Sequence, residues 1–115
     1  MKTLLGLVLA VGILLPSAAV AQNAEPDLKA GKATFVKWCA PCHGEGIYMT
    51  GTNALRAKYK DAKPALLEQR TDLTPEFVKG FVRKGAGLMA PFRKTEISDA
   101  ELDALAAYLS RKEPR

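Results

Sequence analysis

Apolar residues recur at intervals of three and four in the first clear pattern of the chain, which comprises Leu28, Gly31, Phe35 and Trp38. Lysines fall between them, so the pattern predicts an amphipathic helix with one buried face. Asp27 stands where an N-cap is expected. Gly31 lies on the same face as Phe35, and a residue without a side chain at this point predicts the close approach of a second helix.

A second helix is expected to follow Thr74 as its N-cap, with Pro75 at the first helical position. Gly85 stands where such a helix commonly ends. The apolar stripe of this helix is formed by Phe77, Val78, Phe81 and Val82. These side chains could belong to an ordinary core, or they could line one wall of a cofactor pocket.

The best-marked helix follows Ser98, which can form a capping box with Glu101. Ile97 and Leu102 occupy the positions of a hydrophobic staple around this box. The apolar stripe and its flank then consist of Leu102, Leu105, Ala106, Tyr108 and Leu109. Alanines at 104, 106 and 107 would let this helix cross the first helix closely at Gly31.

The remaining segments carry weaker signals. Short helices are expected at 54–59 and 65–70, and glycine-containing loops at 44–53 and 85–92. No stretch of any length alternates as a half-buried strand would, and there is no internal repeat. The chain is therefore predicted to be all-α.

The N-terminal stretch has the features of an export signal. Lys2 precedes an apolar run from Leu4 to Leu15, and Ala19-Val20-Ala21 is a small-x-small cleavage site. The run is too short to be a convincing membrane span. We therefore expect residues 1–21 to be a secretory signal peptide and residues 22–115 to form one small periplasmic domain without a stable membrane span.

Charge narrows the range of partners. The chain of 115 residues has a formal net charge of +5, of which the signal peptide holds only Lys2. The basic residues are scattered, and no aromatic residues alternate with them on a basic face, so nucleic acid is not an expected partner. A basic rim that docks an acidic redox partner and an ordinary solvated surface remain equal alternatives.

Both cysteines and the only histidine lie in one hexapeptide, Trp38-Cys39-Ala40-Pro41-Cys42-His43. Cys-x-x-Cys-His is the attachment sequence of c-type haem. Two thiols three positions apart can each add to a vinyl group on the same edge of a haem, and the adjacent histidine can ligate its iron. The motif predicts one covalent haem c, bound through Cys39, Cys42 and His43.

Other interpretations of the hexapeptide compete with haem attachment. Trp-Cys-Ala-Pro-Cys also resembles a thioredoxin-like redox site, and an exported protein could use the two cysteines as a structural disulfide. A zinc site would need a fourth nitrogen or sulfur ligand, and no Cys or His remains to supply one. A helix is expected before Cys39, where a thioredoxin would have a buried strand. Exported thiol–disulfide oxidoreductase therefore remains the alternative function.

Met89 is the candidate for the second axial ligand of the iron. Met49 lies only six positions after His43 on the same short loop, so it would struggle to reach the opposite face of the haem. Met89 lies on a separate loop beyond a helix, where it could approach from the other side. A His and a Met together are the ligands of electron-transfer cytochromes c. A third hypothesis, an open distal site that senses or reduces a small ligand, would apply if Met89 only fills space.

Taken in order, these features resemble a monohaem class I cytochrome c. The resemblance rests on Gly31-x-x-x-Phe35, on Cys39-x-x-Cys42-His43, on Met89 before the last helix and on Leu105-x-x-Tyr108 within that helix. It implies a small all-α fold wrapped round one haem, with the N- and C-terminal helices crossing. It also implies that Cys39 and Cys42 carry the thioethers, that His43 is the proximal ligand and that Met89 is the distal one.

The chain departs from the family pattern at two places. The family usually has a proline after the haem histidine whose carbonyl holds the imidazole, whereas this chain has Thr50-Gly51-Thr52-Asn53 there. The family also often has Met-Pro at the distal ligand, whereas this chain has Met89-Ala90-Pro91. The group that orients His43 is therefore not identified by the sequence, although a metal-bound histidine normally has such a partner.

The function expected from these features is single-electron transfer in the periplasm, without catalysis of its own. The chain more loosely resembles small cytochrome subunits that accept electrons from flavin-dependent dehydrogenases of the alkylphenol-oxidising type. The expected partners are accordingly redox proteins, with a flavin-dependent dehydrogenase as donor and a downstream cytochrome or respiratory oxidase as acceptor.

Overall fold

A computed structural model describes residues 26–60 and 62–112 of the chain. The predicted signal peptide, residues 1–21, lies outside the described residues. One continuous helical run opens the fold and consists of α1 (Leu28–Thr34), a π-helical turn η1 (Phe35–Cys39) and α2 (Ala40–His43). Asp27 caps this run as predicted, because the Ala30 amide donates to its Oδ1 at 2.9 Å. The helix that leads into Cys39 thus continues through His43.

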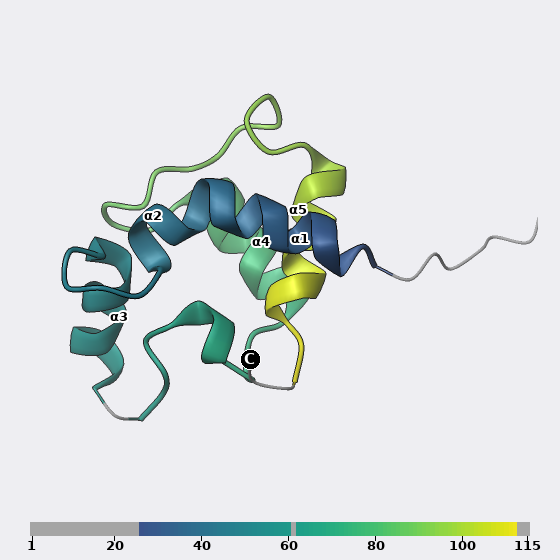
Figure 1. The fold of residues 1–115 in the computed structure, drawn as a ribbon. Helices are drawn as coiled ribbons and strands as arrows, with labels where there is room; N and C mark the ends of the chain where they lie inside the picture. Colours follow the sequence, from purple (N-terminus) through teal and green to yellow (C-terminus); the bar gives the residue numbers. More distant parts are fainter. Residues whose placement is uncertain (1–25, 61, 113–115) are drawn as a thin grey trace, which may run out of the picture.

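The predicted crossing of the first and last helices is confirmed (Figure 1). Helix α5 (Asp99–Leu109) passes across α1 so closely that a Cβ added at Gly31 would lie 2.2 Å from the Ala104 carbonyl oxygen. The rings of Phe35 and Tyr108 meet at the same crossing, with their centroids 6.1 Å apart. The capping box at the start of α5 is also present, with Ser98 and Glu101 each accepting from the other's backbone amide.

Helix α4 (Pro75–Lys84) begins where the sequence predicts and packs against α5. Its N-cap is Thr74, whose hydroxyl accepts from the Phe77 amide at 3.2 Å. Only half of its apolar stripe is buried. Val78 and Val82 belong to the core, whereas Phe77 and Phe81 are 44% and 40% exposed and stack on each other. Because residues one position apart on a helix differ by about 100° in direction, the side of α4 that faces α5 and the core buries the valines and leaves the phenylalanines outside.

The prediction of a loop over 44–53 is wrong at its end. Helix α3 (Thr50–Tyr59) starts four residues before the predicted helix at 54–59. Its first turn is held by contacts to the preceding loop, where Thr52 Oγ1 donates to the Gly44 carbonyl at 2.8 Å and Asn53 Nδ2 donates to the Ile47 carbonyl at 2.7 Å. The helix predicted at 65–70 shortens to a single 3₁₀ turn, η2 (Leu67–Gln69).

The core lies between the opening helical run, α4 and α5. Its buried members include Phe35, Leu73, Val78, Val82, Ile97, Leu102, Leu105, Tyr108 and Leu109. Across residues 26–60 and 62–112 the structure contains no strand, and only Ala86 and Met89 form an isolated bridge. The all-α class is confirmed, and none of the helices in this part of the chain is long and apolar enough to cross a bilayer.

Candidate functional site

The two cysteines and the histidine meet in the last turn of the opening helical run. Cys39 ends the π-helical turn and is 8% exposed, whereas Cys42, one turn later in α2, is exposed. Both thiols are free. Burial raises the pKa of the Cys39 thiol to about 11, and the neighbouring Cys42 adds to this shift. Residues three apart on a helix lie on the same side, so both sulfurs are placed to bond one edge of a planar group.

His43 lies at the end of α2 in contact with the backbone of α3. A Cβ added at Gly51 would lie 2.6 Å from His43 Cε1 and 2.8 Å from Nδ1, which is closer than packed atoms allow. The Nδ1 atom is buried, and no group within the described chain forms a hydrogen bond with it. Burial lowers the pKa of the imidazole, which favours the neutral form that binds metals.

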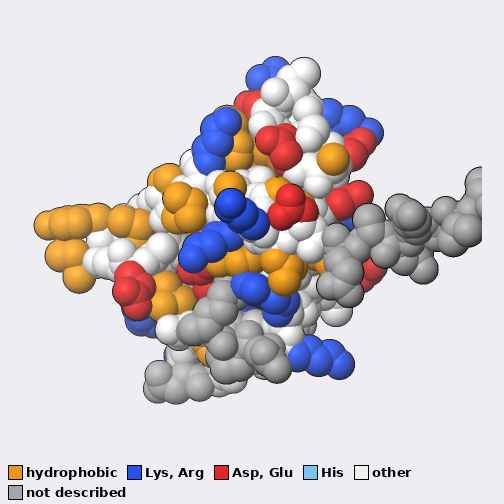
Figure 2. Space-filling model, turned by 45° about the vertical axis from the view of Figure 1, so that its right-hand side comes forward, with side chains coloured by type: hydrophobic (Ala, Val, Ile, Leu, Met, Phe, Trp, Pro, Cys, Tyr) orange, Lys and Arg blue, Asp and Glu red, His pale blue; other side chains and the backbone are white. Residues whose placement is uncertain are grey.

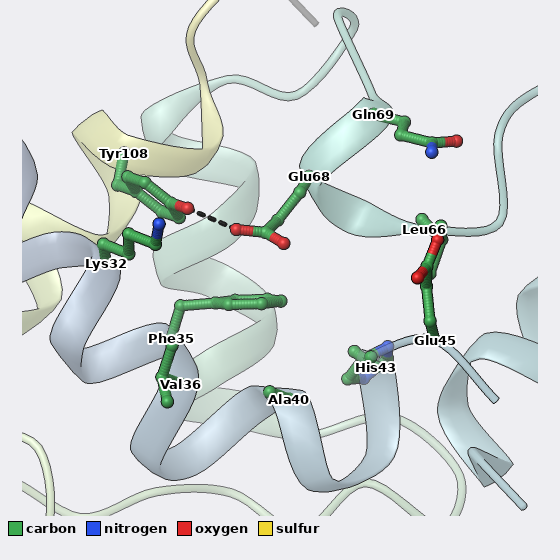
Figure 3. A pocket seen from close by; sticks show the side chains of 11 residues that line it. Lys32, Phe35, Val36, Ala40, His43, Glu45, Leu66, Glu68, Gln69 and Tyr108 are labelled. Atoms are coloured by element: carbon green, nitrogen blue, oxygen red, sulfur yellow. Dashed lines mark hydrogen bonds between the residues drawn. The ribbon is translucent and has the colours of Figure 1, made fainter. Parts of the chain in front are cut away.

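A cavity of about 410 Å³ lies beside His43 (Figure 3). Helix-borne Phe35, Val36 and Ala40 form one apolar wall, and Leu66 faces them from the segment before η2. The polar part of the lining is contributed by Lys32, Glu45, Glu68, Gln69 and Tyr108. The volume of the cavity lies within the range of about 300–1,000 Å³ that is typical of small-molecule and cofactor sites.

The side chain of Glu68 reaches into this cavity and accepts a hydrogen bond from the Tyr108 hydroxyl (Figure 3). This bond ties η2 to α5 across a separation of 40 residues. Sequence patterns gave no indication that Glu68 or Gln69 borders the site. Both residues reach it through a long connection without regular periodicity, so no local signal could have identified them.

The residues present fit a covalently attached haem. The thiols are free, burial favours the neutral imidazole, and its Nδ1 is a buried atom without a hydrogen-bond partner in the described chain, beside a cavity with one apolar wall. Gly51 also fits this arrangement, because the imidazole of His43 occupies the space that a side chain at position 51 would need. Cys39, Cys42 and His43 are thus brought together as the motif requires.

Met89 lies apart from the lining of this cavity. It is half-buried on the loop between α4 and α5, where it packs against the core together with Trp38 and Phe92. The loop is fixed to α4, because the Phe92 amide donates to the Val82 carbonyl at 2.8 Å. The ligand role of Met89 therefore stays a prediction that the cavity itself does not test.

Comparison with known proteins gives an independent view of the whole chain. The family model described as "Cytochrome C oxidase, cbb3-type, subunit III" matches residues 26–109. Cytochrome c6 from Synechocystis sp. is 35% identical over 83 residues, which cover 72% of this chain and 63% of that relative. The match therefore spans less than two thirds of the relative's length. No solved structure matches the chain significantly.

The family match extends from before α1 to the end of α5, and so includes the helix crossing, the Cys-x-x-Cys-His turn and the loop of Met89. The all-helical fold agrees with it, and the free thiols beside the half-buried imidazole of His43 are what covalent attachment of haem c requires. The chain belongs to the class I cytochrome c family, whose members carry covalently bound haem c.

Proposed function

We propose that this protein is a periplasmic single-electron carrier with one haem c, attached through Cys39 and Cys42 and ligated by His43 and Met89. The observation that carries this proposal is the turn that places two free thiols next to a half-buried imidazole, with a buried Nδ1, at the edge of a cavity. When bound, the haem supplies a reversible one-electron couple between ferric and ferrous iron. No general acid, base or nucleophile is needed for this function.

The chain's own residues have separate tasks in this scheme. Cys39 and Cys42 fix one edge of the haem to the helix, and His43 supplies a nitrogen ligand from the same turn. Phe35, together with other apolar side chains of the cavity, would pack against the haem. A low local dielectric and a thioether ligand both affect the reduction potential, so we expect Met89 to hold it at the higher values of His/Met cytochromes.

Met89 is favoured over Met49 because of where each side chain lies. Met49 is the N-cap residue of α3, and its side chain packs within 3.7 Å of the position that a Cβ on Gly46 would take. It is therefore turned toward the short loop that follows His43. Met89 lies on a separate loop that is anchored on α4, and its side chain packs against the core.

The alternative function, an exported thiol–disulfide oxidoreductase, is disfavoured by the state of Cys39. Enzymes of this kind attack through a thiolate whose pKa is lowered by a helix N-terminus or a nearby cation. Here burial raises the pKa of Cys39, so the thiol stays protonated at neutral pH. The cysteines also end a helical run instead of starting one.

The proposed location and partners rest on the export signal and on the surface near the site. Basic and acidic side chains are interspersed on the face shown in Figure 2, and several of the basic residues are paired, such as Lys79 with Asp103 and Lys94 with Asp99. Such pairs favour the ordinary solvated surface over a basic docking rim. Exposed Tyr48 and Leu88 lie near His43 and Met89 in the sequence, and apolar contacts of this kind suit brief docking of a redox protein.

A flavin-dependent dehydrogenase is the proposed donor, and a downstream cytochrome or oxidase is the proposed acceptor. The description of the matched family names a subunit of an oxidase, which supports a role of this chain in respiratory electron transfer.

The test of the function is haem attachment in a host that matures c-type cytochromes. We expect the purified protein to keep its haem through acid–acetone extraction and to be oxidised and reduced by one electron. The double variant Cys39→Ser/Cys42→Ser should release its haem under the same extraction. A colourless product with two titratable thiols would overturn the proposal and support the thiol enzyme.

A further inference from the structure

The residues after His43 differ from the usual family pattern at the point where a proline carbonyl holds the haem histidine. The corresponding stretch here contains Gly51 and Thr52, and it forms the first turn of α3 instead of a loop. No group of the described chain accepts a hydrogen bond from His43 Nδ1. The imidazole must therefore be oriented by something other than a hydrogen bond to a proline carbonyl.

Gly51 restricts the orientation of the imidazole by close contact with the ring. Its backbone lies against the imidazole so closely that an added Cβ would stand 2.6 Å from Cε1, 2.8 Å from Nδ1 and 2.9 Å from the Cys42 carbonyl oxygen. Real Cβ contacts are essentially never shorter than 3.0 Å, so any other residue would push the ring or the backbone of α2 away. The backbone of the first turn of α3 thus lies against the Cε1 and Nδ1 atoms of the His43 ring.

Thr52 contributes to the orientation of the imidazole by holding the first turn of α3 in place. Its side chain is completely buried, and its hydroxyl donates to the carbonyl of Gly44 at 2.8 Å. Gly44 directly follows His43, so this bond ties α3 to the residue next to the proposed ligand. A buried hydroxyl left without its acceptor would cost free energy, so the bond resists any movement of α3 away from His43.

We propose that Gly51 and Thr52 are the positioning residues of His43, and that in this chain packing against α3 replaces the proline carbonyl. Gly51 leaves the space in which the ring lies, and Thr52 holds the turn of α3 against it. This inference rests on the proposed ligation of haem iron by His43. It assigns to both residues the task of setting the plane of the imidazole, beyond any general contribution to folding.

The test compares ferric holoprotein variants by the paramagnetically shifted haem-methyl resonances in their NMR spectra, which depend on the orientation of the axial ligands. Gly51→Ala and Thr52→Val should both shift this pattern beyond the spread among wild type and controls. Thr52→Ser keeps the hydroxyl and should restore the wild-type pattern. Gly80→Ala is the matched glycine control because nothing lies within 4 Å of its added Cβ, and Thr50→Val is the threonine control because Thr50 is exposed in the same helix.

The outcomes separate this inference from the proposed function. Haem-methyl patterns of Gly51→Ala and Thr52→Val that superimpose on wild type would overturn the inference, with His43 ligation still intact. If Gly51→Ala yields no folded holoprotein, the comparison of Thr52→Val with Thr52→Ser decides alone. A His43→Ala variant whose haem keeps the wild-type optical and NMR spectra would instead overturn the ligation on which the inference rests.

Discussion

At the scale of single residues, the chemistry of the site follows from burial. Burial lowers the pKa of His43, which favours the neutral imidazole, and a neutral imidazole has a free lone pair for iron. Cys39 is the buried member of its pair, so its thioether would lie on the core side of the haem edge, with that of exposed Cys42 toward solvent. The same helical turn therefore combines one shielded and one accessible attachment point.

The distal ligand gives the first prediction. Met89→Ala should abolish the weak red-end absorption of a Met–iron bond and lower the reduction potential, because a thioether ligand raises that potential. Met49→Ala is the matched control and should leave both properties unchanged, since Met49 packs on its own loop. Optical spectroscopy of the ferric protein and redox titration measure the two effects. Loss of the band in Met49→Ala alone would reverse the assignment.

Asp72 gives a second prediction, which concerns stability and its dependence on pH. The Arg70 guanidinium donates to both oxygens of Asp72, each at 2.7 Å, and Arg70 is 3% exposed. Hydrogen bonds from Arg70 and then from Lys63 hold the pKa of Asp72 well below its usual range. Asp72→Asn should lower the free energy of unfolding at pH 7 by about 1–2 kcal/mol, a value reduced for the partial exposure of Asp72.

The sign of the pH dependence follows from the direction of this shift. A carboxyl whose pKa is lower in the folded state stabilises the protein above its unfolded pKa, near 3.9, and loses that effect as the pH falls toward the folded pKa. The stability difference between wild type and Asp72→Asn should therefore be constant near neutrality and shrink on acidification below about pH 4. Denaturant titrations at several pH values measure it, with Asp103→Asn, which breaks the exposed Lys79 pair, as the control. A difference independent of pH would contradict this account.

At the scale of elements, helix starts with their own capping residues were predictable. Asp27, Thr74 and Ser98 each cap the helix expected from the sequence, because a cap is a contact between residues two or three positions apart. The start of α3 was missed because it depends on Thr52 reaching back to Gly44, eight positions away. The exposure of Phe77 was missed for a related reason, since it depends on which side of α4 faces α5 and the core.

The α1–α5 crossing gives a third prediction. Gly31→Ala would place a Cβ 2.2 Å from the Ala104 carbonyl oxygen and 2.6 Å from Tyr108 Cβ. Neither atom is the flexible end of a side chain, so the helices must separate, at a cost of about 1–3 kcal/mol. Thermal and denaturant unfolding of the holoprotein should show this loss.

Gly80→Ala provides the contrast for Gly31→Ala. Its added Cβ meets nothing within 4 Å, and alanine is a better helix former than glycine, so it should stabilise α4 by up to about 1 kcal/mol. If Gly31→Ala and Gly80→Ala changed the free energy of unfolding equally, α1 and α5 would be packed less closely at Gly31 than the structure shows.

At the scale of the whole molecule, the cavity and the helix crossing share side chains. Phe35 and Tyr108 line the cavity beside His43 and also pack on each other where α1 meets α5. The hydrogen bond from Tyr108 to Glu68 extends this connection to η2. The motif predicted the attachment points and Gly31 predicted the helix crossing, whereas the contact of Tyr108 with Glu68 joins residues 40 positions apart and could not be predicted from local patterns.

The fourth prediction follows from this shared packing. Protein made without haem attachment, as Cys39→Ser/Cys42→Ser, would have to keep a cavity of about 410 Å³ open in a small domain. Without haem the apolar part of its lining would be exposed to water, which is unfavourable, and a domain of this size has little stability in reserve. The haem-free protein should therefore relax at the crossing, and the amides of α1 and α5 should lose hydrogen-exchange protection together. Hydrogen exchange of the double-serine variant is to be compared with that of the wild-type holoprotein. Protection that persists in α1 and α5 without haem would show that the crossing is stable by itself and that the haem only occupies a space the fold already maintains.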